Sequence, residues 1–170
     1  SDAPITTFDY TFYGCSSLTS APELPATNLA SYCYEGMFEG CSSLTSTPEL
    51  PATTIASMCC YEMFRGCSSL TTAPELPATT LAESCYDGMF WNCSKLENIT
   101  MLATDISANS CLSYWVYGVA STGTFIKHKD MKTYKFVTGT TKSVTIHLRV
   151  NGRSERVNIE APVSYGITDK

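Results

Sequence analysis

Apolar positions along this chain recur every 26 residues between residue 12 and residue 116. A fixed period of this length is typical of an array of stacked units, in which each unit packs only against its neighbours. Four columns of cysteine, leucine and phenylalanine carry the repeat: Cys15, Cys41, Cys67 and Cys93; Cys33, Cys59, Cys85 and Cys111; Leu18, Leu44, Leu70 and Leu96; Phe12, Phe38, Phe64 and Phe90. We expect these columns to form ladders in one continuous core.

Each unit contains a stretch in which apolar residues lie four apart. Leu29, Cys33, Met37 and Cys41 define this spacing in the second copy. One face of a helix has this period, so the spacing predicts a short helix over residues 29–41. A residue in the left-handed conformation commonly follows a helix, and glycine and asparagine tolerate it best. The column that we assign to this position holds Gly14, Gly40, Gly66, Asn92 and Gly118.

The remainder of each unit reads as a short extended rung. The stretch "LTSAPEL" at residues 18–24 is too short for a helix, and its proline limits ladder hydrogen bonding. The fourth copy, "ENITMLATDISANSC", lacks both prolines and slips by one residue before Cys111, while Trp115 is placed to close the stack. The expected fold is therefore an α/β repeat solenoid of 26-residue units, each a short extended rung plus a short helix.

The repeated stretches "FYGCSSLT", "FEGCSSLT" and "FRGCSSLT" resemble the BspA-like leucine-rich repeats of bacterial surface proteins. The resemblance covers about residues 8–130, and the "APELPAT" elaboration is similar to proteins of gut Bacteroidetes. It implies a leucine-rich-repeat solenoid, secretion or display on the cell surface, and binding of host proteins, glycans or other bacteria. It implies no enzyme activity and no cofactor.

The period ends before the C-terminal residues. Two alternating stretches flank Asn151-Gly152, which is the strongest short signal for a β-hairpin. We expect two parts: a repeat region over residues 1–130, with about four units and a capping fragment, and a small antiparallel β cap or module over residues 131–170.

Charge divides the chain in the same way. Residues 1–122 carry twelve acidic and two basic side chains, and residues 123–170 carry four acidic and nine basic ones. An acidic main body disfavours nucleic acid as a partner. No apolar run is long enough to cross a membrane. Since the chain begins with Ser1, we expect a mature or trimmed form. The resemblance implies an extracellular or cell-surface location, with a precursor that can be lipid-anchored. We expect a monomer.

The nine cysteines have three interpretations: reduced core ladders, disulfides and metal ligands. Stacked side chains of one column point the same way, whereas a disulfide needs facing Cβ atoms, so we favour buried free thiols. No zinc-type spacing of cysteine and histidine is present, and we expect no metal. Cys60 stands outside both columns, and its redox state is left open.

Two columns of residues that are expected to face outward are candidates for binding a partner. The column Tyr13, Glu39, Arg65, Trp91 and Tyr117 varies between copies while its neighbours stay fixed, so the core does not constrain it. Its alternative interpretation is scattered surface aromatics. Glu23, Glu49 and Glu75 form a ladder of like charges, with a solvated rim as the alternative.

No catalytic constellation is present, since the serines recur as "CSS" in each copy and no G-x-S-x-G stretch exists. We therefore expect no enzyme, and the resemblance implies a non-catalytic cell-surface or secreted module that binds a protein or a glycan. The alternatives are a structural spacer in a larger surface protein and an accessory protein of a carbohydrate-utilisation system.

Overall fold

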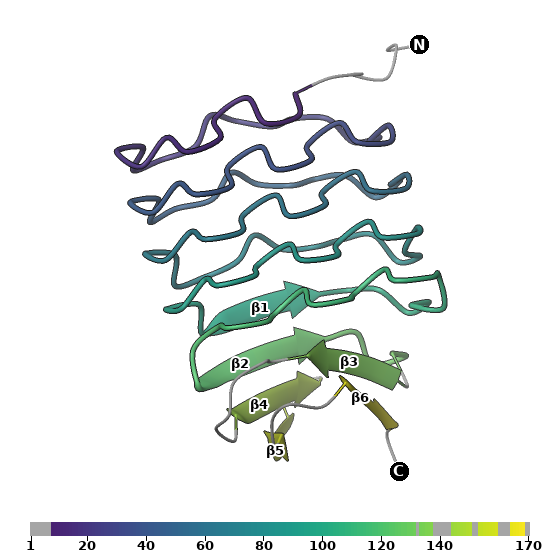
Figure 1. Ribbon diagram of the computed structural model, residues 1–170. Coiled ribbons are helices and arrows are strands. Elements are labelled where there is room, and N and C mark those ends of the chain that lie inside the picture. The colour runs from purple at the N-terminus through teal and green to yellow at the C-terminus, as the bar shows by residue number, and fades with distance from the viewer. Residues whose placement is uncertain (1–7, 132, 138–143, 151–152, 160–163, 169–170) are drawn as a thin grey trace.

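The computed structural model describes residues 8–131, 133–137, 144–150, 153–159 and 164–168, with side chains described as far as residue 131. Figure 1 shows successive turns of the chain, here called coils, stacked one below another. The coils span residues 8–30, 31–56, 57–82, 83–108 and 109–131. Backbone hydrogen bonds join each coil to the next, at sequence separations of 25 or 26 residues over most of the stack.

The predicted α/β repeat solenoid is wrong, because none of the described residues forms a helix. The stretches expected to be helical are runs of consecutive turns over residues 31–40, 57–66, 83–92 and 109–118. A right-handed helix cannot contain left-handed residues, yet φ is positive at every fourth position of these runs. The residues concerned are Tyr32, Gly36, Gly40, Met58, Glu62, Gly66, Ser84, Gly88, Asn92, Ser110, Tyr114 and Gly118.

Backbone N–H groups in a run alternate between two uses. The N–H groups of Tyr34 and Gly36 donate to carbonyls of the next coil at 2.8 Å. Those of Glu35 and Met37 donate to the carbonyl three residues back, at 3.2 and 3.3 Å. The same alternation recurs in the third and fourth coils. The run therefore bonds to its neighbour as a strand does, while its apolar side chains keep the four-residue spacing of a helix.

The predicted left-handed column is confirmed. Gly14, Gly40, Gly66, Asn92 and Gly118 have φ values of 69°, 76°, 74°, 59° and 73°. A Cβ built on Gly40 would lie 3.5 Å from the Cα of Gly14, so the column also packs closely from coil to coil. Gly and Asn stand here because both tolerate positive φ.

The rungs become regular strands only beyond the proline-containing copies. Isolated bridges join the first rung to the second, at Ser20–Ser46 and Asn28–Thr54, and the third rung to the fourth, as at Thr72–Asn98. The fourth rung lacks proline and forms β1 (Asn98–Met101). The one-residue slip is confirmed, since Leu76 pairs with Met101 instead of with Leu102.

One sheet continues the stack at its other end. Its order is β1, β2 (Thr122–Lys127), β4 (Val144–Val150) and β5 (Arg153–Ile159), with β1–β2 and β2–β4 parallel and β4–β5 antiparallel. A separate antiparallel pair joins β3 (Thr133–Val137) and β6 (Ser164–Thr168). The two strands expected around Asn151-Gly152 are present as β4 and β5, while Asn151 and Gly152 lie outside the described residues. The sheet crosses position 130, and the boundary between residues 1–130 and 131–170 stays a prediction.

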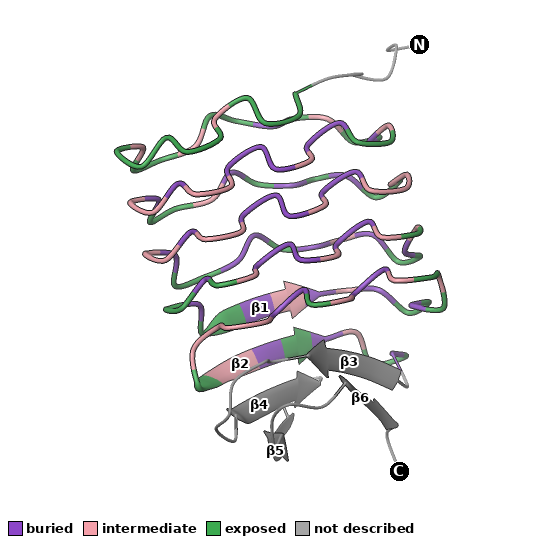
Figure 2. Cartoon of the chain, viewed as in Figure 1, coloured by how far each residue is buried: buried purple, intermediate pink, exposed green. Residues whose placement is uncertain are grey.

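Buried positions recur at the same places in successive coils, as Figure 2 shows. The rings of Phe12, Phe38, Phe64 and Phe90 stack in parallel, with centroids 5.4, 5.5 and 5.8 Å apart. Trp115 is fully buried between the rings of Phe90, at 6.5 Å, and Phe125 of β2, at 5.9 Å, so it lies inside the stack and does not close its end as expected. The ring ladder thus runs through four coils into the fifth.

The cysteine ladders are free thiols, and all but Cys15 are buried. Cys15 was expected in the core but is exposed, and Leu18 is only partly buried, because the first coil lies at the end of the stack. In the interior the thiols are also donors: Sγ of Cys67 lies 3.2 Å from the carbonyl oxygen of Phe38, and Sγ of Cys93 lies 3.0 Å from that of Phe64. Each of these carbonyls also accepts an N–H from its own turn, so the thiol occupies its second lone pair.

Alkylation should separate the end of the stack from its interior. We expect iodoacetamide to modify Cys15 alone in the folded protein, because the eight other thiols are buried. Burial also raises the pKa of Cys67 to about 12, which holds that thiol in its unreactive protonated form. All nine cysteines should react after unfolding, as read by mass spectrometry. Two or more disulfide links in the intact protein would contradict the ladders.

Candidate binding surfaces

The variable column predicted from the sequence is a line of side-chain contacts along the runs of turns. A guanidinium nitrogen of Arg65 lies 3.7 Å from a carboxylate oxygen of Glu39. On its other side the guanidinium carbon sits 4.6 Å from the ring centroid of Trp91. The Trp91 and Tyr117 rings follow at 5.2 Å. The structure therefore connects four of the five predicted residues, from the second coil to the fifth.

A second outward column, which the sequence analysis missed, borders the first. It holds Tyr10, Gly36, Glu62, Gly88 and Tyr114, in which a large side chain alternates with glycine. A Cβ on Gly36 would collide with the Tyr10 ring, and one on Gly88 would lie 2.9 Å from Cγ of Glu62. Tyr10 and Glu62 therefore each cover the glycine of the next coil. The alternation at a spacing of 26 residues was the available signal.

The two columns contact each other in the third coil and again between the fourth and fifth coils, and we call them together the turn face. Glu62 binds Arg65 through a 2.9 Å hydrogen bond, and the Tyr114 ring stacks on Trp91 at 5.4 Å. Trp91, Tyr114 and Tyr117 form a three-ring cluster. Arg65 and Tyr114 both pack against the indole of Trp91, and Trp91 is only partly exposed. Tyr114 is therefore the principal exposed ring of the cluster.

Tyr13 does not join that cluster. It lies in the first coil, where its ring contacts Tyr10 at 5.8 Å, and Glu39 and Arg65 occupy the column between it and Trp91. The turn face thus has exposed tyrosines at both ends. Exposed fractions are 59% for Tyr13 and 42% for Tyr10 at one end, and 48% for Tyr114 at the other.

Carboxylates dominate the electrostatics of the turn face. Burial and the nearby Glu62 raise the pKa of Glu39, and Arg65 opposes that shift. Burial and Glu62 also raise the pKa of Asp87 from 3.8 to about 6. Arg65 is thus the single cation among several acids at the centre of this face.

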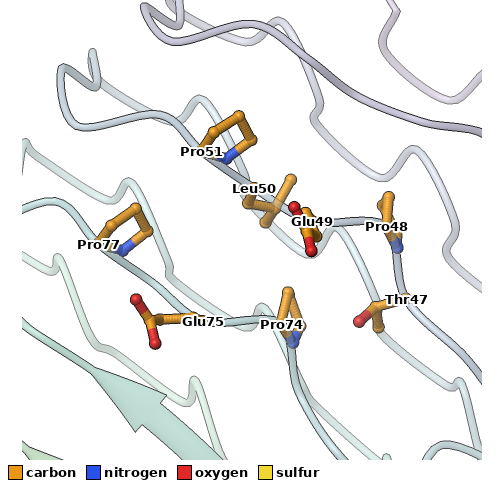
Figure 3. Close-up of a pocket in the computed structure, with 8 residues that line it drawn as sticks. All are labelled: Thr47, Pro48, Glu49, Leu50, Pro51, Pro74, Glu75 and Pro77. Carbon is orange, nitrogen blue, oxygen red and sulfur yellow. The ribbon is translucent and has the colours of Figure 1, made fainter.

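The glutamate ladder lies on the rungs, beside a groove. Glu23, Glu49 and Glu75 are all exposed, and no ion pair to them occurs among the described residues. Figure 3 shows proline rings and the carboxylates of Glu49 and Glu75 around one depression of about 440 Å³. A neighbouring depression of about 600 Å³ includes Glu23 and Glu49 in its lining.

The described residues contain no cluster of three or more histidine, cysteine or acidic side chains suited to a metal ion. Nδ1 of His128 lies 3.7 Å from a carboxylate oxygen of Asp130, which also pairs with Lys129 at 2.7 Å in an exposed turn. Within the same part of the chain, no helix is long and apolar enough to span a membrane.

No family model matches this sequence, and neither a curated protein nor a solved structure matches the chain. The resemblance to BspA-like repeats is accordingly an interpretation of the motif.

The raised pKa of Asp87 predicts a pH dependence of folding. A carboxyl group that binds its proton more tightly when folded stabilises the fold at low pH, and this contribution is lost as the pH rises from about 4 to about 6. Asp87→Asn should remove that contribution, so its unfolding free energy should fall less over this range than that of the wild type. Urea denaturation at a series of pH values measures both, and identical pH profiles would contradict the assignment.

Proposed function

We propose that this protein is a non-catalytic binding domain whose turn face contacts a protein or a glycan. The supporting observation is the exposed Tyr114 ring, which packs against Trp91 and Tyr117, while Arg65 packs against Trp91. Tyrosine, tryptophan and arginine are the side chains enriched at the energetic centres of interfaces. Tyr114 also needs little further ordering on binding, because two rings already pack against it.

The scaffold favours binding through this face. Consecutive coils are tied by backbone bonds of 2.7–3.3 Å along the runs of turns, so outward side chains from different coils have fixed relative positions. A partner can therefore contact side chains from several coils at once, as partners of repeat proteins do. The proposal of an extracellular or cell-surface location rests on the motif resemblance.

The test uses a pair of tyrosines with matching backbones. Tyr114 and Tyr32 have positive φ values of 50° and 61°, and their exposed fractions are 48% and 49%. Glycine removes either ring without backbone strain. The wild type would be screened against a glycan array and a panel of extracellular matrix proteins, and its affinity for each hit would then be measured for both variants.

We expect Tyr114→Gly to weaken binding to a hit by at least about tenfold, the scale of an interface centre, and Tyr32→Gly to leave it unchanged. Equal affinities for wild type and Tyr114→Gly would exclude this cluster as the contact surface. Complete silence on both panels would favour the structural spacer.

A further inference from the structure

We propose that the groove along the "PELP" rungs is a second docking site, and that its occupant is an extended segment of a partner protein carrying regularly spaced lysine or arginine. The groove belongs to the three proline-containing rungs at residues 21–25, 47–51 and 73–77. Its two depressions share Thr47, Pro48, Glu49 and Pro51, so they lie next to each other on the two sides of the second rung and together span three coils. This site lies on the rungs and is independent of the turn face.

Proline creates the groove by interrupting the contact between coils. Proline has no N–H to donate, and among the described residues no backbone hydrogen bond joins residues 21–26 to residues 47–52. Where the fourth rung lacks proline, the N–H of Leu76 reaches the carbonyl of Thr100 at 3.0 Å. The N–H groups of Glu23 and Glu49 donate to no backbone carbonyl among the described residues.

The lining is stiff and mostly apolar. Pro22, Pro25 and Pro51 present exposed rings to the groove, whereas Pro48, Pro74 and Leu50 line it but are buried. Proline rings have few conformations to lose, so little ordering accompanies binding here. The hydrocarbon stem of a lysine or arginine would pack on such rings while its charged end stays in water.

Charge selects a cationic occupant. Glu23, Glu49 and Glu75 stand in or beside the groove without an ion-pair partner among the described residues. Residues 1–122 contain only two basic side chains, and Arg65 is already paired on the turn face. A partner that carries positive charge is therefore attracted by the negative charge of these three carboxylates.

Spacing selects the conformation of the occupant. Backbone hydrogen bonds between the runs of turns stack successive coils about 4.8 Å apart, and at this coil spacing Glu23 and Glu75, two coils apart, lie about 10 Å from each other. A polyproline II helix rises about 3.1 Å per residue, so side chains three residues apart repeat every 9.3 Å or so on one face. Side chains two apart in a β-strand repeat at about 6.7 Å and fit neither one coil nor two. The geometry favours cations at every third position of a polyproline II segment.

The experiment uses a fluorescent peptide, Lys-Pro-Pro-Lys-Pro-Pro-Lys, and a control of the same composition with its three lysines adjacent. Titration of the full chain would be followed by fluorescence anisotropy. We expect the spaced peptide to bind at least about tenfold more tightly than the control. Equal binding of both peptides would mean attraction to the acidic body in general, and would overturn the proposal, as would no binding of the spaced peptide.

Matched charge variants locate the site. The double variant Glu23→Gln/Glu75→Gln should weaken binding of the spaced peptide at least tenfold or so. Glu83→Gln/Glu97→Gln removes the same charge from exposed positions of the fourth coil, outside the groove, and should leave binding unchanged. An equal loss of affinity for the spaced peptide in the two double variants would mean that the groove is not its binding site. Tyr114→Gly should bind the peptide as the wild type does, so failure here is distinct from failure of the proposed function.

Discussion

The structure depends on one backbone constraint: in the runs of turns, alternate N–H groups close turns and the intervening ones bond to the next coil. A chain can alternate in this way only if it reverses locally, and the reversal requires a left-handed residue at every fourth position. The ring ladder, the thiol ladders and the outward columns all take their spacing from this arrangement. Because each coil bonds to the next, the same side-chain position returns once per coil and builds a column.

The constraint also separates scaffold from surface. Inward positions repeat as phenylalanine, cysteine and leucine because each coil presents the same small space to its neighbour. Outward positions are free to differ, and there the chain carries Arg65, Trp91 and Tyr114. The rungs follow a different rule, since proline prevents close pairing and opens a groove. The two candidate surfaces therefore arise from different local chemistry on one scaffold.

Sequence reasoning could reach the 26-residue period, the left-handed column at Gly40, the slip before Cys111 and the strands flanking Asn151-Gly152. It could not distinguish a helix from a run of turns, because both place Leu29, Cys33 and Met37 on one side. The distinguishing signal was weak, since Tyr32, Met58 and Glu62 adopt positive φ without being glycine. The exposure of Cys15 and the packing of Tyr10 over Gly36 depend on neighbouring coils, which a local pattern does not contain.

The unfolding free energies of two variants at Ser84 test the backbone constraint most directly. Ser84 lies within a stretch whose spacing suggests a helix, but its φ is 49°. In a helix, alanine would be more stable than serine, and glycine less stable, by roughly 0.5 kcal/mol each. At a left-handed position the order reverses. We expect Ser84→Gly to raise the unfolding free energy by about 1 kcal/mol. We expect Ser84→Ala either to leave the unfolding free energy unchanged or to lower it. Stabilisation by alanine together with destabilisation by glycine would contradict the account.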